Sequence, residues 1–532
     1  LTSLSRSISP PPGSRNITPG PSAAPASVDQ HITPDNVPLK PSKQKCTFVP
    51  SPVQLSKIRD LPPSANIDTV CLKDLLCDPM IRELWLFDYL FDIDFVMAAL
   101  DEDVRSIVQV KIIHGSWRRD DTHRIALENE AAQYSNVQLI TAYMPEAFGT
   151  HHTKMMIMIR HDENAQVVIH TANMIHQDWA NLSQAVWRSP LLPLIRVPDQ
   201  EEVAKSLPIG SGRRFKTDLL HYLSAYGNRL TALISQLRNH DFSSVRAALI
   251  ASVPSRQQSK DVQPAQRTAW GWRGLREILR TISCQTKERS AAVIVVQVSS
   301  IASLGQSNTW LTEFRDHLSC SADTNAAGGF TPGTPKLKIV YPTTDEIRGS
   351  LDGYGSGGSI HMKTQTAAQQ KQLHYIQPFL HRWAGRAPGS RFSSAGKALR
   401  QRAAPHIKTY VRFADETQTR VDWAMVTSAN LSTQAWGALP KGAGEVRICS
   451  YEVGVVVWPA LFAGCASDGK GKEAVMVPVF GKDVPSTLQE MEDDKVVVGF
   501  RMPYDLPLAP YSSSDTPWCA SAPHLEPDWK GQ

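Results

Sequence analysis

The sequence lacks several features that would assign it to a simple class of protein. Its 532 residues include only eight cysteines, scattered without a Cys-x-x-Cys pair, so neither a disulfide framework nor a structural zinc site is indicated. No stretch approaches the roughly 18 consecutive apolar residues that a membrane-spanning helix needs. No signal peptide is visible, and the chain begins at Leu1 rather than Met, as is typical of a fragment.

A large excess of charge of one sign is also absent. The net charge of +5 comes from 56 basic and 51 acidic residues. Residues 1–50 alone have five basic and two acidic residues, a net charge of +3, so the remainder is close to neutral. Bulk charge therefore does not identify a nucleic-acid-binding protein, and any site for an anion must be local.

Composition divides the chain into a tail and a folded body. Residues 1–50 contain ten prolines and a single aromatic residue, Phe48, which is typical of a disordered tail, and we expect order to begin near Val53. Beyond it, strand-like apolar runs alternate with segments of helical spacing, such as 219–237 and 311–318. This alternation predicts an α/β fold with buried sheets.

One constellation occurs twice. Each copy has a His-x-Lys triplet, two strand-like runs and a Ser/Thr-Ala-Asn triplet, with a tryptophan six residues after the asparagine. The shared positions are His152, Lys154 and Asn173 in the first copy and His406, Lys408 and Asn430 in the second. Agreement in all these elements indicates an internal repeat rather than a chance match.

The spacing of this repeat has a chemical consequence. Residues i and i+2 of a strand point to the same side, so each histidine and lysine would share one surface with the asparagine of the adjacent strand. Two copies facing each other would place two imidazoles on opposite sides of one phosphate. This suits in-line displacement at phosphorus, in which one imidazole attacks and the other protonates the leaving oxygen. Because the motifs are nearly symmetric, spacing alone does not decide which histidine attacks.

Three other patterns carry less weight. His361 and Lys363 form a third His-x-Lys, but no strand pair with asparagine follows, so we interpret it as an incidental surface pair. Residues 353–358 match Gly-x-Gly-x-x-Gly without the strand, helix and downstream acid of a dinucleotide site. His151 stands beside His152, yet no carboxylate ligands accompany the pair. We therefore expect neither a metal nor another cofactor.

These motifs resemble the tyrosyl-DNA phosphodiesterase family of the 3′-phosphotyrosyl type, a branch of the phospholipase D superfamily. General members carry an aspartate five residues after each lysine, whereas this chain has Ile159 and Phe413 there. The resemblance lies in FGTHHTKMM at 148–156, PHIKTY at 405–410, VTSANLS at 426–432 and SYEVG at 450–454, and extends over about residues 53–518. It implies two similar lobes, each a mixed β-sheet flanked by helices, in a pseudo-twofold arrangement. We expect a tail over 1–52 and lobes over 53–250 and 251–532.

The resemblance also implies a role for each residue. His152 would be the nucleophile that forms a phosphohistidine with the DNA 3′-phosphate, and His406 the general acid and base. The remaining catalytic positions would be Lys154, Lys408, Asn173, Asn430, Gln184 and Glu452, the last two orienting the imidazoles. The expected substrate contacts are Phe148, Ser300, Ser303, Ser432 and Lys371 (or a neighbouring glutamine) for DNA, and Tyr89, Trp518 and the loop 353–359 for peptide. Cys449 stands at a position where the family can have arginine, which leaves one backbone contact in question.

The implied activity is metal-independent hydrolysis of the bond between a DNA 3′-phosphate and tyrosine, as in topoisomerase I adducts, or another 3′-blocking group. We expect a monomeric DNA-repair enzyme of the nucleus, a location that follows from the substrate alone. Two alternatives stay open. A general phospholipase D or nuclease of the same superfamily is disfavoured by the absent aspartates, and an inactive DNA-end-binding scaffold by the two complete motifs. The sequence does not decide between single- and double-stranded ends.

Overall fold

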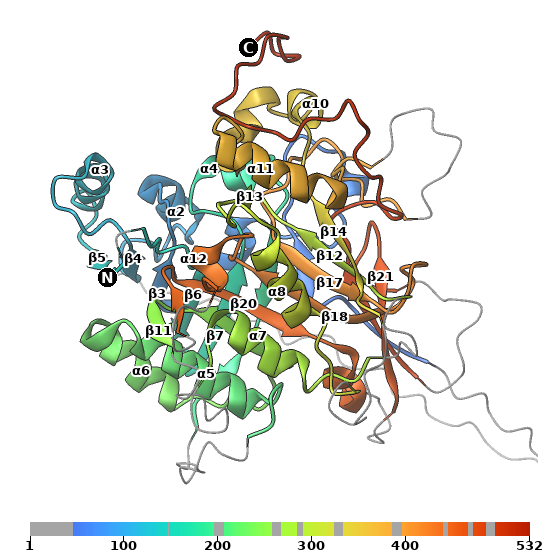
Figure 1. Ribbon diagram of the computed structural model, residues 1–532. Coiled ribbons are helices and arrows are strands. Elements are labelled where there is room, and N and C mark those ends of the chain that lie inside the picture. The colour runs from blue at the N-terminus through green and yellow to red at the C-terminus, as the bar shows by residue number, and fades with distance from the viewer. Residues whose placement is uncertain are drawn as a thin grey trace, which may run out of the picture. The chain divides into compact units, whose positions relative to one another are not determined.

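Two large mixed β-sheets form the framework of the molecule, and helices cover them (Figure 1). The computed structural model describes residues 46–146, 148–195, 207–257, 268–284, 291–323, 333–385, 396–439, 445–465, 472–485 and 495–532. Residues 1–45 of the tail expected over 1–52 lie outside this part. The described residues, from Cys46 onward, belong to one compact unit. The α/β fold class expected from the sequence is confirmed.

The first sheet is built from residues 53–193. Its strand order is β2-β8-β7-β6-β3-β4-β5, with β9 beside β7. The strands are β2 (Val53–Leu55), β3 (Ile81–Phe87), β4 (Gln109–His114), β5 (Val137–Thr141), β6 (Met155–Arg160), β7 (Asn164–His170), β8 (Ala185–Arg188) and β9 (Leu192–Pro193). β3, β4 and β5 pair in parallel, and the pairs from β3 to β2 are antiparallel.

The second sheet has the order β1-β22-β21-β18-β17-β12-β14-β16, and β20 pairs with both β18 and β10. Its strands are β1 (Thr47–Val49), β10 (Ala248–Ser252), β12 (Val293–Gln297), β14 (Lys336–Val340), β16 (Leu380–His381), β17 (Thr409–Phe413), β18 (Val421–Thr427), β20 (Glu452–Val457), β21 (Ala474–Val479) and β22 (Val496–Arg501). Two short ribbons join β11 (Ser255–Gln257) to β19 (Val446–Ile448) and β13 (Ser300–Ile301) to β15 (His361–Met362).

The two sheets share a seven-strand topology. The path β2-β8-β7-β6-β3-β4-β5 of the first sheet corresponds to β10-β20-β18-β17-β12-β14-β16 of the second. Corresponding neighbours are antiparallel as far as β3 and β12 and parallel beyond them in both sheets. The strands also follow one another in the same order along the chain. The repeat read from a few motif residues therefore extends to whole sheets.

Helices lie on the faces of both sheets because the central strands are apolar on both sides. The α-helices are α1 (Leu72–Leu76), α2 (Ile93–Ala99), α3 (Thr122–Ala131), α4 (His176–Ala180), α5 (Gly212–Ser224), α6 (Thr231–Arg238), α7 (Gly271–Leu279), α8 (Thr309–Leu318), α10 (Thr344–Arg348), α11 (Ala367–Ile376) and α12 (Thr433–Trp436). The 3₁₀ segments are η1 (Pro63–Ala65), η3 (Gly227–Leu230), η6 (Gly353–Ser359), η7 (Gln377–Phe379) and η8 (Pro459–Cys465).

The strand β6 shows how one run of apolar residues serves two cores. Met156 and Met158 join the cluster formed with α1, α2 and α3, whereas Ile157 and Ile159 point to the other side. That other side forms a core with α5 and α6 and with residues of β12, β17 and β18 in the second sheet. Because side chains alternate along a strand, this core joins the two sheets directly.

Three expectations about element boundaries need correction. Order begins before Val53, because residues 47–49 form β1, which pairs in parallel with β22. The segment 219–237 is not one helix, since α5 ends at Ser224 and Gly227 adopts a φ of +69° at the start of η3. The expected boundary at residue 250 falls inside β10, a strand of the second sheet.

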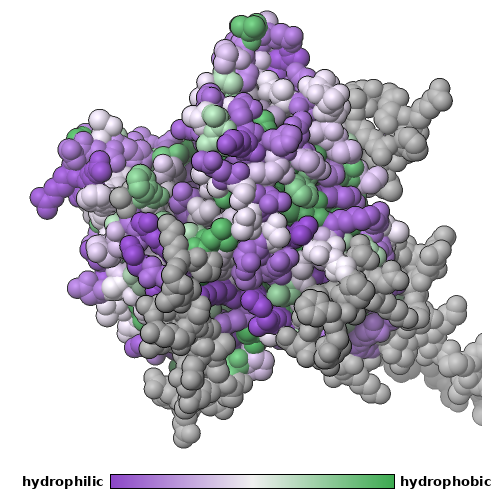
Figure 2. All heavy atoms as spheres, in the orientation of Figure 1, coloured by the Kyte–Doolittle hydropathy of each residue, from purple (hydrophilic) through white to green (hydrophobic). Residues whose placement is uncertain are grey.

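The surface has the character expected once these apolar faces are covered. On the face shown in Figure 2, hydrophilic residues predominate and hydrophobic ones form small separate patches. Within the described residues, no helix is long and apolar enough to cross a membrane. Several of the largest apolar residues, including Trp85, Trp310 and Trp423, are fully buried.

Candidate active site

The two His-x-Lys triplets occupy equivalent places in the two sheets. His152 and Lys154 immediately precede β6, and His406 and Lys408 immediately precede β17. Each triplet therefore lies in the segment that leads directly into its strand. The asparagines follow the ends of the antiparallel neighbours β7 and β18, and thus lie at the same edge of each sheet as the triplets.

Backbone hydrogen bonds join the edges of the two sheets, and each triplet bonds to a segment of the other half of the chain. The amide of His152 donates to Tyr451 O over 3.0 Å, just before β20. In the other half, the amide of Ile407 donates to Ser183 O over 2.8 Å, just before β8. Each triplet is thereby held beside the strand of the other sheet that supplies its histidine's partner. The six motif residues consequently face one shared site.

The repeated tryptophans fix the asparagine backbones. Trp179 Nε1 donates to Asn173 O and Trp436 Nε1 donates to Asn430 O, both over 3.0 Å. Both indoles are almost completely buried. The spacing of six residues in the sequence therefore serves the same structural purpose in both copies.

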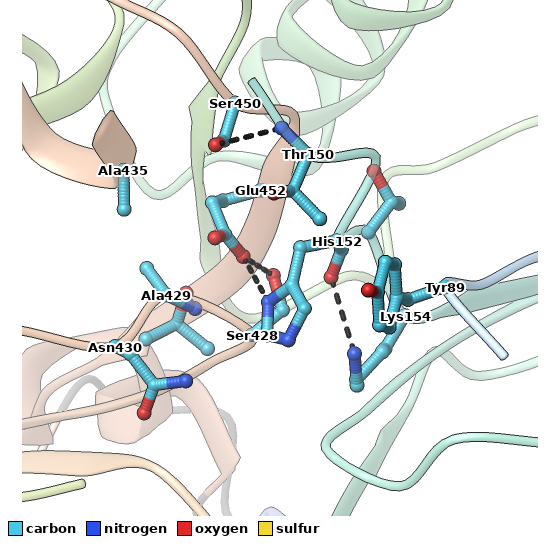
Figure 3. Close-up of polar contacts among 12 residues, drawn as sticks. Tyr89, Thr150, His152, Lys154, Ser428, Ala429, Asn430, Ala435, Ser450 and Glu452 are labelled. Carbon is cyan, nitrogen blue, oxygen red and sulfur yellow. Dashed lines mark hydrogen bonds and ion pairs between the residues drawn. The ribbon is translucent and has the colours of Figure 1, made fainter. Parts of the chain in front are cut away.

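His152 pairs with a carboxylate from the second sheet (Figure 3). Its Nδ1 lies 2.9 Å from Glu452 Oε2, which also accepts a 2.5 Å hydrogen bond from Ser428 Oγ. Burial lowers the pKa of His152, Glu452 opposes that shift, and Lys154 adds to it. With a proton on Nδ1 facing Glu452, Nε2 keeps its lone pair for attack.

His406 lies beside polar groups of residues 53–193, the part of the chain that builds the first sheet. Its Nδ1 lies 3.1 Å from Gln184 Nε2 and 3.1 Å from Asp178 Oδ2. Gln184 Oε1 accepts a 2.8 Å hydrogen bond from Thr171, the counterpart of Ser428. Burial and the ammonium of Lys408 lower the pKa of His406, whereas Asp178 raises it. The structure thus brings Gln184 and Glu452 to the two imidazoles and adds Asp178, which the repeat did not reveal.

The two lysines are fully buried beside acidic residues. Lys154 Nζ lies 3.8 Å from Asp88 Oδ1, and burial raises the pKa of the Asp88 carboxyl to about 8 against the charge of that lysine. Lys408 Nζ lies 3.2 Å from His406 Nε2. Burial, together with the positive charge of Lys154, lowers the pKa of Lys408 well below its usual value. An anionic group that entered the site would offset the cost of burying these two ammonium groups.

The two asparagines present their amides differently. Asn430 Oδ1 accepts hydrogen bonds from the amides of Ser299 and Ser300, over 3.1 and 2.9 Å. Its Nδ2 is consequently turned toward the side on which His152 lies (Figure 3). Asn173 donates from Nδ2 to Asp178 over 2.9 Å. The site therefore offers amide and ammonium donors from both sheets.

The residues expected to contact DNA differ in exposure. Phe148 is 81% exposed, and Ser303 is exposed as well. Ser432 is instead buried and caps α12 by accepting from the amide of Ala435. Lys371 on α11 is exposed, whereas the neighbouring Gln372 is held by Leu304 N and Ala302 O, which leaves Lys371 as the available polar group of the two.

Around the expected peptide side, Tyr89 is half exposed and its ring centroid lies 6.0 Å from that of His152. Trp518 is only 3% exposed, stacks on Tyr354 and donates to Gly357 O, so it supports η6 instead of presenting its ring to solvent. The expectation that Trp518 forms a cleft wall therefore needs correction.

Three further features border the site. Cys449 is half buried, and its carbonyl oxygen would lie 2.1 Å from a Cβ at residue 149, so only glycine fits at Gly149. His361 is exposed and lies on β15 opposite Ser300 of β13. A cavity of about 560 Å³ beside Tyr89 is lined by Trp117 among others. Within the described ranges, no cluster of three or more potential ligand side chains could hold a metal ion.

Comparisons with known proteins point to one family. The family model described as tyrosyl-DNA phosphodiesterase matches residues 52–512. A probable tyrosyl-DNA phosphodiesterase of Schizosaccharomyces pombe is 30% identical over 91% of this chain and 95% of its own length. Tyrosyl-DNA phosphodiesterase 1 of Arabidopsis thaliana is 31% identical over 91% of this chain and 76% of its own. The crystal structure of the yeast tyrosyl-DNA phosphodiesterase has a TM-score of 0.60 at 20% identity, covers 89% of this chain and 100% of its own, and so shares the fold.

Proposed function

The chain belongs to the tyrosyl-DNA phosphodiesterase family, and from this premise we propose that it is a phosphodiesterase that hydrolyses the bond between a DNA 3′-phosphate and tyrosine. The observation that carries the proposal is the reciprocal pairing of the two imidazoles. Each lies at the edge of one sheet and is held by an acid or amide side chain of the other. Two such imidazoles suit attack on phosphorus and protonation of the leaving oxygen.

In the first step, Nε2 of His152 attacks the phosphorus, so a P–N bond forms as the P–O bond to tyrosine breaks. His406 gives its proton to the tyrosine oxygen, which leaves as a neutral phenol. Lys154, Lys408, Asn173 and Asn430 stabilise the charge on the phosphoryl oxygens. This role accords with the burial of both lysines.

In the second step, His406 takes a proton from water, and the water oxygen attacks the phosphorus. The P–N bond breaks and its electron pair returns to Nε2 of His152. The products are free enzyme and DNA ending in a 3′-phosphate. Because the two lysines supply positive charge and the two asparagine amides supply hydrogen-bond donors around the phosphoryl group, we propose that the reaction needs no metal ion.

We also propose two lobes, one for each copy of the seven-strand topology, with the boundary just before β10. The exposed ring of Phe148 would stack on a DNA base, with Ser300, Ser303, Ser432 and Lys371 near the DNA backbone. Tyr89 and η6 would border the peptide. The physiological substrate would be a topoisomerase I adduct or another blocked 3′ end, processed by a monomer in the nucleus.

The direct test is incubation with an oligonucleotide carrying 3′-phosphotyrosine in the presence of EDTA. We expect release of tyrosine and an oligonucleotide with a 3′-phosphate. An oligonucleotide with 5′-phosphotyrosine and vesicles of phosphatidylcholine serve as matched substrates that should remain intact. Absence of tyrosine release, or release that depends on a divalent metal, would contradict the proposal.

A further inference from the structure

The two halves of the site differ at one buried position. Five residues after Asn173 the chain has Asp178, on α4, whereas five residues after Asn430 it has Ala435, on α12. Both side chains are almost completely buried. The first half therefore contains a carboxylate that the second half does not repeat.

Asp178 is engaged on both of its oxygens. Oδ2 accepts hydrogen bonds from the backbone amide and Nδ2 of Asn173, over 2.7 and 2.9 Å, and lies 3.1 Å from His406 Nδ1. Oδ1 accepts a 3.2 Å hydrogen bond from Ser359 Oγ of η6. The carboxylate thus has a fixed orientation with one oxygen directed at the imidazole.

Gln184 lies at the same distance from His406 Nδ1, but it turns its amide nitrogen, a hydrogen-bond donor, toward this atom and so cannot accept a hydrogen bond from it. Its Oε1 already accepts from Thr171, and its Nε2 donates to the backbone oxygen of Asp178 over 3.2 Å. Turning the amide round would place two carbonyl oxygens against each other. The group that faces Nδ1 from Gln184 is therefore a donor, and Asp178 is left as the acceptor.

We propose that Asp178, and not Gln184, is the functional counterpart of Glu452: a positioning residue that holds a proton on Nδ1 of His406 and stabilises this imidazole when Nε2 also carries a proton. The inference rests on the proposed function, because it concerns the proton that His406 exchanges with the tyrosine oxygen and with water. Gln184 then serves to brace Asp178 through its backbone oxygen.

The charges around His406 explain why such a residue is needed. Lys408 Nζ lies 3.2 Å from Nε2, and Lys154 also faces the imidazole from the first sheet. Burial and these two ammonium groups disfavour a second proton on the ring. Burial opposes ionisation of Asp178 as well, but His406, the Asn173 amide and Lys408 lower the pKa of its carboxyl. At His406, the aspartate is therefore the acidic group that opposes the effect of both lysines on the pKa of the imidazole.

The test uses two substrates that differ in their need for an acid. The full chain and its Asp178→Asn variant are compared on oligonucleotides ending in 3′-phosphotyrosine and in a 3′-(4-nitrophenyl) phosphodiester, because nitrophenolate leaves without a proton. In single-turnover reactions, we expect the variant to lose about 10- to 100-fold in rate on the tyrosine substrate and much less on the nitrophenyl substrate. The pH above which the rate on the tyrosine substrate falls should also be about one unit lower in the variant, because without the carboxylate His406 loses its proton more readily.

The control is Asp218→Asn, which removes another buried carboxylate, one that pairs with Arg214 on α5 away from the site. It should keep the wild-type ratio of the two rates. If Asp178→Asn folds poorly, Asp178→Ala with added formate replaces it, and formate should restore the tyrosine reaction selectively. The inference would be overturned if Asp178→Asn lowered both rates equally and left the pH profile unchanged. It would also be overturned if formate did not selectively restore the tyrosine reaction of Asp178→Ala. Failure of the wild-type protein to release tyrosine would instead refute the proposed function.

Discussion

Glu452 Oε2 lies 2.9 Å from Nδ1 of His152, although 300 residues separate the two in the chain. The carboxylate begins β20 of the second sheet, and the imidazole precedes β6 of the first. His406 likewise has its partners in the other half of the chain, because Asp178 lies on α4 and Gln184 immediately precedes β8 of the first sheet. The site is therefore complete only when both sheets have folded against each other.

The first prediction concerns Glu452→Gln. The substitution removes the negative charge opposite Nδ1 of His152 and leaves an amide beside Ser428. Because the imidazole loses the group that fixes its tautomer, we expect the rate of the first step to fall about 10- to 1000-fold. Rapid-quench measurement of covalent adduct formation checks this.

The matched control for that variant is Glu83→Gln, which removes a nearly buried carboxylate that pairs with Lys111 on β4, outside the site. It should form the adduct at the wild-type rate. A Glu452→Gln protein with an unchanged rate would show that the carboxylate does not act on His152.

A second prediction concerns Phe148, whose side chain is 81% exposed. If its ring stacks on a base, Phe148→Ala should weaken binding of a single-stranded oligonucleotide by about 1–3 kcal/mol. Fluorescence anisotropy with an uncleavable 3′-hydroxyl oligonucleotide measures this. Ile107→Ala, at another exposed apolar residue away from the site, should bind like the wild type. Equal affinities for all three proteins would refute stacking by Phe148.

The third prediction concerns stability and pH. His170 is fully buried, and burial with Lys154 lowers its pKa to about 3. An unfolded histidine titrates near pH 6.5, so below that pH the unfolded state binds the proton and the folded state does not. His170 therefore costs stability as the pH falls, by about 2 kcal/mol at pH 5.

We accordingly expect His170→Phe to reduce the loss of unfolding free energy between pH 7 and pH 5 by about 2 kcal/mol. Urea unfolding at both pH values measures it. Val168→Ala on the same strand removes apolar contacts without removing a titrating group, so it should keep the wild-type pH dependence. An unchanged dependence in the His170 variant would contradict the prediction.

The fourth prediction concerns the buried ion pair between Arg412 on β17 and Asp422 on β18, where Nε and Oδ2 lie 3.1 Å apart. Asp422→Ala leaves a buried guanidinium without its carboxylate, which should cost about 3–5 kcal/mol of unfolding free energy. The double variant Arg412→Met with Asp422→Leu should recover most of this loss. A double variant as unstable as Asp422→Ala would show that lost packing, and not unpaired charge, is responsible.

The sequence predicted the chemistry of the site better than its surroundings. The six motif residues were found because the duplication places the same residue types at the same offsets in both sheets. Asp178 was missed for the same reason, since its counterpart is Ala435 and a search for repeated positions passes over it. Asp88, far from the motifs in sequence, meets Lys154 only through the pairing of β3 with β6.

Local patterns also failed where distant partners decide the structure. Phe48 belongs to a strand because β22 offers it a parallel edge from the other end of the chain. Trp518 is an aromatic residue near the end of the matched region, but only the tertiary packing shows that its ring lies beneath η6. The spacing of residues within one segment contains no information about either contact.

The central claim is that His152 forms the covalent intermediate while His406 exchanges the proton. The most direct measurement is mass spectrometry of the His406→Ala protein after brief incubation with the 3′-phosphotyrosyl oligonucleotide. The account predicts that an acid-labile nucleotide adduct accumulates on the peptide containing His152. This adduct should be absent from the double variant His152→Ala with His406→Ala. An adduct on another residue, or turnover by the His152→Ala protein at the wild-type rate, would contradict it.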